Sequence, residues 1–162
     1  MTLQGFLKKN FLRDLEKQEK NSGKKNINIF MVKLRLVLDS NEYIFYINNK
    51  TTDIQELLAL NSIEIFLNDL IFREVIRNLR KDLIISFISL LKNPKFNVSW
   101  EKIPEEVIEK YKKLGLKKGD VIIASFCESI DANCLISENR HFLRSNLDKT
   151  QILSLKEFME RL

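Results

Sequence analysis

Cysteine and histidine are scarce in this sequence, which has two cysteines and one histidine among 162 residues. Cys127 and Cys134 are seven residues apart in apolar segments, and His141 is not at ligand spacing from either of them. A protein zinc site needs more of these ligands at suitable spacing. We therefore exclude a zinc site and predict that both cysteines are reduced thiols in the hydrophobic core.

Long hydrophobic runs are also absent. No apolar stretch approaches the length needed to cross a bilayer, and the basic N-terminus lacks the hydrophobic stretch of a signal peptide. We therefore expect no membrane association and a cytoplasmic location.

Basic residues are in moderate excess, with 27 Lys and Arg against 22 Asp and Glu and a net charge of +5. This balance favours contact with a polyanion such as nucleic acid. Lysine pairs such as Lys112–Lys113 and Lys117–Lys118 are equally typical of solvated helix faces and loops. Charge alone leaves both interpretations open.

With 44% hydrophobic residues, the chain is long enough for one globular domain with a substantial core. We assign this domain to residues 31–162 and treat residues 1–30 as an extension. Apolar residues at helical spacing predict an amphipathic helix at about 3–20, and the segment "NSGKKN" after it is typical of a linker. Met31 is an alternative start of translation.

Hydrophobic patterning divides the domain into alternating strands and helices. Strands are predicted at 27–39, 62–68, 97–100, 133–139 and 152–155. Helices are predicted at 41–50, 53–60, 70–80, 81–93, 103–115, 119–130 and 155–162, with Asp53, Asp69 and Asp120 as N-caps. The segment 81–93 is apolar nearly all round, which predicts burial on two sides or a subunit interface. Strands separated by helices indicate an α/β fold, a three-layer α/β/α arrangement with a central parallel sheet.

Asp39 ends a strand of apolar residues, where a carboxylate loses much of its hydration and needs a partner. It either caps the following helix or binds a cation. In a parallel sheet, ligands bind beyond the carboxyl ends of the strands, and Glu74, Ser137 and Asn139 follow strands toward that edge. Converging carboxylates would suit Mg²⁺ or Mn²⁺. Local patterns allow simpler roles, with Asp120 as a helix cap, Glu74 solvated and Asn139 in a turn.

Four stretches in order strengthen the cation interpretation: "LVLDSN", "LNDLIFREVIRNL", "LGLKKGDVIIASFCESIDANCLISENRHF" and "ILSLKEFMERL". Together they resemble the PIN-domain family, which includes VapC-type toxins, over about residues 31–162. The resemblance implies a metal-dependent ribonuclease acting on single-stranded RNA. It also implies the toxin of a toxin–antitoxin pair, with an antitoxin protein as partner, and it allows a homodimer.

The resemblance assigns roles residue by residue. Asp39, Glu74 and Asp120 match the family's catalytic and metal-binding acids, which would hold Mg²⁺ or Mn²⁺. Ser137 matches a supporting hydroxyl. Asn139 falls where many members have a fourth acid, so an amide here brings a ligand oxygen without charge.

Asn41, two residues after Asp39, is a further supporting candidate. His141 is expected at the surface, because a metal-activated water needs no histidine base.

Two rival functions stay open. Asn139 is compatible with a PIN-like RNA- or protein-binding module that has lost efficient catalysis. A receiver or adaptor domain with Asp39 as phosphoacceptor is the other, but the sequence lacks the paired acids and the late strand-end lysine that such a domain needs.

Overall fold

The computed structural model describes residues 33–143 and 145–161. The predicted N-terminal helix, the linker and the alternative start at Met31 lie outside these residues. Within them, no helix combines the length and the apolar character that crossing a bilayer would require.

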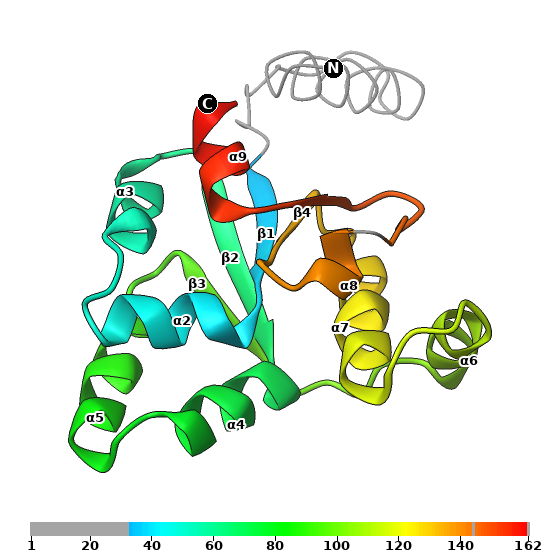
Figure 1. The fold of residues 1–162 in the computed structure, drawn as a ribbon, viewed down its shortest axis with the longest axis horizontal. Coiled ribbons are helices and arrows are strands. Elements are labelled where there is room, and N and C mark those ends of the chain that lie inside the picture. The colour runs from blue at the N-terminus through cyan, green and yellow to red at the C-terminus, as the bar shows by residue number, and fades with distance from the viewer. Residues whose placement is uncertain (1–32, 144, 162) are drawn as a thin grey trace, which may run out of the picture.

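A five-stranded parallel sheet forms the centre of the domain (Figure 1). Its strand order is β3-β2-β1-β4-β5. The strands are β1 (Leu34–Leu38), β2 (Ile63–Asn68), β3 (Phe96–Ser99), β4 (Cys134–Ile136) and β5 (Gln151–Leu153). Since β1 pairs with both β2 and β4, its carboxyl end lies in the middle of the sheet edge.

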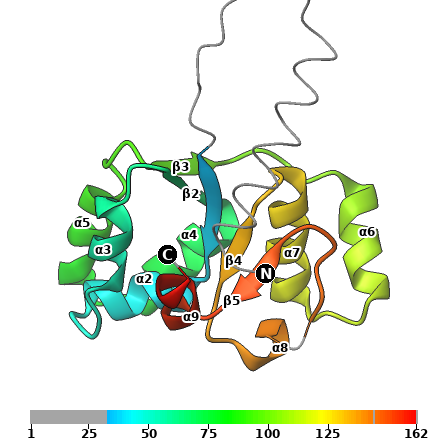
Figure 2. The ribbon, with the colours of Figure 1, turned by 90° about the horizontal axis from the view of Figure 1, so that it is seen from above.

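Helices cover both faces of this sheet, which confirms the predicted three-layer α/β/α fold. They are α2 (Ser40–Ile47), α3 (Asp53–Ala59), α4 (Asp69–Asn78), α5 (Lys81–Leu90), α6 (Glu105–Lys113), α7 (Lys118–Ser129), α8 (Arg140–Leu143) and α9 (Leu155–Glu160). Seen from above, α2 to α5 lie on one side of the sheet and α6 and α7 on the other (Figure 2). This separation follows from crossover direction. The connections that carry the chain from β1 to β3 run one way across the sheet, and those leading to β4 and β5 run the other way.

The core is built from apolar strand residues that are closed off on both faces. Leu36, Val37 and Leu38 of β1 are fully buried, as is every residue of β4. Cys127 and Cys134 are buried free thiols, as predicted, and burial raises the pKa of Cys134 to about 12. A thiol with so high a pKa is protonated at neutral pH and therefore packs as a small apolar group.

The predicted helix caps are wrong in detail. Asn68, not Asp69, caps α4, because its Oδ1 accepts the Ile71 N–H at 3.0 Å. Thr52, not Asp53, is the N-cap of α3. In both cases the acid is the first helical residue. Its charge there interacts favourably with the helix dipole, but its side chain does not cap the helix. An acid near the start of a helix does not by itself show whether it is the N-cap or the first helical residue.

The apolar segment 81–93 is not buried on two sides, which was one of the two alternatives predicted for it. It forms a separate helix, α5, after a break at Leu79–Arg80, where both residues are extended. Phe87 is fully buried, but Ile85 is 75% exposed and Ile88 is 39% exposed. The other alternative, a subunit interface on this face, stays a prediction.

Substitutions on the two faces of α5 should differ sharply in effect. Phe87→Ala removes a buried ring that packs edge-on against Tyr43, with ring centroids 5.7 Å apart, and should lower the free energy of unfolding by about 3 kcal/mol or more. Ile85→Ala should change it by less than about 0.5 kcal/mol. Urea unfolding of both variants measures this. A large, concentration-dependent loss for Ile85→Ala would instead identify α5 as a subunit interface.

Candidate functional site

Asp39 follows the buried end of β1 and is only 6% exposed. Its Oδ1 accepts the Ser40 N–H at 2.7 Å, which makes Asp39 the N-cap of α2. The capping alternative is therefore correct for one carboxylate oxygen. The other oxygen, Oδ2, points to a different element and accepts a hydrogen bond from Ser137 Oγ at 2.7 Å.

The segment after β4 links Asp39 to the start of α7. Ser137 is fully buried, and its Oγ also accepts the Asn139 N–H at 3.0 Å. Asn139 in turn directs Nδ2 toward Asp120 Oδ1 at 3.5 Å and uses Oδ1 to accept the His141 N–H at 3.0 Å. A continuous series of polar contacts therefore runs from Asp39 through Ser137 and Asn139 to Asp120.

Asp120 lies in the first turn of α7, whose N-cap is Lys117, so the prediction of Asp120 as the cap is wrong. The start of α7 reaches the carboxyl edge of the sheet, which places Asp120 beside the other candidates. Burial and the Asp39 carboxylate raise the pKa of Asp120, while His141 and Lys117 oppose this shift. Two carboxylates that influence each other in this way share one electrostatic environment.

Glu74 approaches from the other side of the same edge. A Cβ built on Gly119 would lie 3.9 Å from Glu74 Oε1, so this carboxylate faces the first turn of α7. Glu74 is half-buried rather than solvated, although its position relative to the apolar stripe of α4 indicated solvent. The packing of α7 against α4 explains this difference, because it covers a helix face that looks polar in sequence.

Two further candidates lie on the outside of this edge. Asn41, in the first turn of α2, is exposed, and its supporting role stays a prediction. His141 is also exposed, as expected, and belongs to the short helix α8.

The donors at this edge are carboxylates of Asp39, Glu74 and Asp120 and the amide of Asn139. Such hard oxygen ligands suit Mg²⁺ or Mn²⁺. Among the described residues, no three His, Cys, Asp or Glu side chains lie close enough together to form a metal-binding group. The chemistry of the donors therefore fits a divalent ion, whereas their spacing in this structure does not form a closed coordination shell.

Glu42 belongs to the same corner, and the sequence analysis missed it. It lies in the first turn of α2, is only 5% exposed, and its Oε1 has no hydrogen-bond partner. Burial raises the pKa of Glu42 to about 7, with help from the carboxylates of Glu138 and Asp39, while the Glu138 N–H opposes the shift. A buried, unpaired carboxylate is costly and often marks a functional site.

The only sequence signal for Glu42 is its spacing from Asp39. A glutamate three residues after an N-cap ordinarily accepts the backbone N–H of the cap residue. Here the Asp39 N–H already donates to the Ile136 carbonyl at 2.9 Å. Because the Asp39 N–H is used in strand pairing, it is not available as the hydrogen-bond donor that the local sequence predicts for the Glu42 carboxylate.

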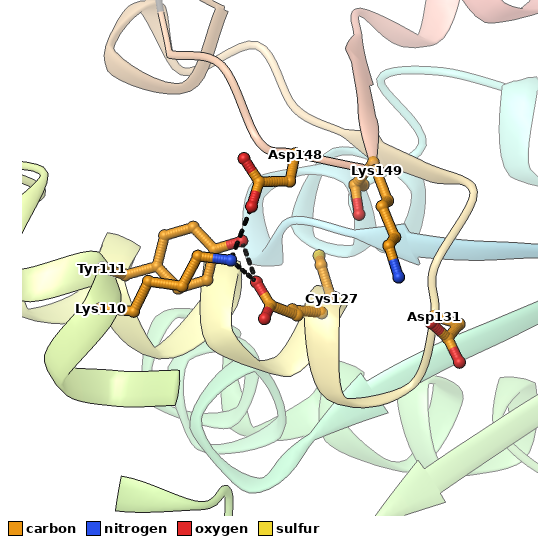
Figure 3. A pocket seen from close by; sticks show the side chains of 8 residues that line it. Lys110, Tyr111, Cys127, Asp131, Asp148 and Lys149 are labelled. Carbon is orange, nitrogen blue, oxygen red and sulfur yellow. Dashed lines mark hydrogen bonds and ion pairs between the residues drawn. The ribbon is translucent and has the colours of Figure 1, made fainter. Parts of the chain in front are cut away.

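A small cavity of about 50 Å³ lies at the opposite, amino-terminal edge of the sheet (Figure 3). Lys110 Nζ contacts Glu128 Oε2 and Asp148 Oδ2 at 2.7 Å each, and the Tyr111 hydroxyl donates to Glu128 at 2.6 Å. These polar groups are paired with one another and tie α6 and α7 to the segment before β5. This cavity is therefore a structural feature, not the candidate site.

Comparison with known proteins gives a consistent answer. The family model described as "PIN domain" matches residues 36–146. The fold is similar to VapBC-1 from nontypeable Haemophilus influenzae, with 21% identity, a TM-score of 0.59 and coverage of 76% of this chain and 99% of the other. It is also similar to VapBC2 from Rickettsia felis, with 18% identity, a TM-score of 0.54 and coverage of 75% and 98%. No curated protein sequence gave a significant match.

Glu42→Gln should stabilise the metal-free protein at alkaline pH. The folded pKa of about 7 lies above the ordinary 4.5. Folding therefore favours the protonated form, and the stability it contributes is complete below about pH 4.5 and is lost as pH rises through about 7. Because glutamine does not ionise, the variant should gain up to about 3 kcal/mol over the parent between pH 4.5 and 8 in EDTA.

Chemical denaturation of both proteins at several pH values measures this gain. The exposed Glu101→Gln serves as the control and should follow the parent at every pH. Parallel stability profiles for the parent and Glu42→Gln would show that Glu42 ionises normally.

Proposed function

The chain belongs to the PIN-domain family, and we propose that it is a divalent-metal-dependent endoribonuclease that cleaves single-stranded RNA. PIN domains are generally nucleases, and the family match covers every acid of the candidate site. The main support is the series of contacts from Asp39 through Ser137 and Asn139 to Asp120. It joins two acids, 81 positions apart in the sequence, at the edge where a parallel sheet binds its ligand.

Asp39, Glu74 and Asp120 are the residues that would hold Mg²⁺ or Mn²⁺. When bound, such an ion supplies positive charge that polarises the scissile phosphate and lowers the pKa of an attacking water. Ser137 fixes the orientation of the Asp39 carboxylate through the 2.7 Å bond to Oδ2. The Ser40 N–H fixes the other oxygen, so Asp39 is oriented before any ligand arrives.

RNA binding would fall to the basic segment that leads into α7. Lys112, Lys113, Lys117 and Lys118 are all exposed and lie within the eight residues before Asp120 in the chain. Lysines at this place can neutralise phosphates close to the carboxylates without entering the site. Arg140, exposed at the start of α8, can do the same from the other side of Asn139.

We further assign the protein to the toxins of toxin–antitoxin pairs, with an antitoxin protein as partner. The support is the fold, since the two structures compared above are of VapBC-1 and VapBC2, and the second is bound to a DNA fragment from their promoter. At 18–21% identity this likeness carries the fold, and the partner is part of the proposal. A homodimer fits the exposed apolar face of α5.

A catalytically weakened RNA- or protein-binding module is the second candidate, and Asn139 favours it. The amide brings no negative charge, and its oxygen already accepts the His141 N–H. As a metal ligand, Asn139 would therefore have to share that oxygen or exchange one partner for another.

Asp39→Asn should reduce cleavage of single-stranded RNA by about tenfold or more, because one ligand charge is lost with almost no change in volume. The fold should persist, since asparagine caps helices as well as aspartate does. Cleavage of a labelled mixed-sequence RNA with Mg²⁺, Mn²⁺ or EDTA measures the effect.

Asp131→Asn is a matched control at the opposite sheet edge, where the positive φ of 50° suits asparagine. It should cleave as the parent does. Cleavage that survives EDTA, or full activity of Asp39→Asn, would contradict the metal-dependent mechanism. No cleavage by the parent with either metal would favour the weakened module.

Asn139→Asp should strengthen Mn²⁺ binding, because it adds a negative charge 3.5 Å from Asp120 with little change in shape. Without metal, the same charge should reduce stability modestly through repulsion. Calorimetric titration and thermal unfolding with and without Mn²⁺ test both statements. Equal Mn²⁺ affinity of variant and parent would place residue 139 outside the metal site.

A further inference from the structure

Three acids belong to the start of α2 and the loop after β4: Asp39 is the N-cap of α2, Glu42 lies in its first turn, and Glu138 directly follows Ser137. Glu138 and Asp39 are the two charges that most strongly disfavour ionisation of Glu42. Of the ion pairs that residues 33–143 and 145–161 form, none includes any of these three residues. None of the three acids is therefore balanced by a basic side chain at ion-pair distance.

Acids at a surface can repel one another harmlessly in water, but Glu42 is not at the surface. It is 5% exposed, and its Oε1 lacks a hydrogen-bond partner. The Glu138 N–H favours its ionised form. A buried carboxylate with an unpartnered oxygen needs either a proton or a cation.

The residues around Asp39 differ in the negative charge that they could bring to a cation bound there. Asn139 is neutral, and its amide oxygen is occupied by the His141 N–H. Ser137 is neutral and donates its proton to Asp39. Glu42 is the buried acid in the first turn of α2, and its N–H donates to the carbonyl of the Asp39 N-cap at 3.1 Å.

We propose that Glu42 is an additional acid of the cation site at Asp39 and supplies negative charge that Asn139 does not. This inference rests on the proposed metal-dependent function and assigns that site one more residue. The ligand is a divalent cation, which would balance the carboxylates of Asp39 and Glu42 together.

The alternative is a permanently protonated Glu42, which acts as a neutral polar residue under the loop at 137–139. The two roles predict different responses to Mn²⁺. A neutral acid is replaced by glutamine without loss of cation binding. A carboxylate that balances the ion is not.

The test is calorimetric titration of the full chain with Mn²⁺ at pH 7.5, comparing the parent with Glu42→Gln. The variant should bind Mn²⁺ about tenfold more weakly, as expected for loss of one charge beside a divalent ion. It should also gain less in melting temperature when Mn²⁺ is added. Its melting temperature in EDTA should equal or exceed that of the parent, which separates weaker binding from misfolding.

Two variants make the outcome unambiguous. Glu101→Gln, on an exposed segment, controls for the general loss of one negative charge and should bind Mn²⁺ as the parent does. Asp39→Asn should lose most of the binding. If Asp39→Asn weakens binding and Glu42→Gln does not, the inference about Glu42 is wrong while the metal site stands. If the parent itself binds no Mn²⁺, both the inference and the proposed metal dependence fail.

Discussion

The hydrogen bond from Ser137 to Asp39 is the interaction on which the candidate site depends. It joins the end of β1 to the end of β4, and both groups are almost fully removed from solvent. Asp39 also caps α2 through its other oxygen. One carboxylate thus fixes the start of a helix and the path of the loop after a neighbouring strand. Its orientation is set by the sheet, and the positions of Ser137 and Asn139 follow from it.

The strand order places this carboxylate at the centre of the edge. Because β1 lies between β2 and β4, the elements that follow these strands converge on Asp39. Glu74 arrives on the helix after β2, and Asn139 on the loop after β4. Asp120 arrives differently, at the start of the helix that leads into β4. Because α7 runs antiparallel to the strand it leads into, its start lies at the carboxyl edge, where Glu74 of the neighbouring α4 faces it.

Electrostatic repulsion is the constraint that the site must resolve. Burial and neighbouring acids raise the pKa of both Glu42 and Asp120, so the protein holds carboxylates where their ionisation is disfavoured. Basic side chains do not neutralise Glu42, whereas Lys117 and His141 moderate Asp120. A fold that accepts this repulsion sacrifices some stability, and under the proposed function a bound cation would offset that loss.

The sequence by itself determined the parallel α/β fold and the order of its elements, because apolar runs separated by amphipathic helices leave few other ways to bury their surfaces. It also drew attention to Asp39, since a carboxylate directly after a buried strand needs a partner, although the residues alone left a helix cap and a cation ligand open. Local patterns could not place Asp120 or Glu74, whose surroundings depend on how α7 packs against α4. Nor could they find Glu42, since strand pairing occupies the Asp39 N–H that a glutamate at its position would ordinarily contact. Only the tertiary structure decided these positions, because burial and charge at a sheet edge arise from elements far apart in the chain.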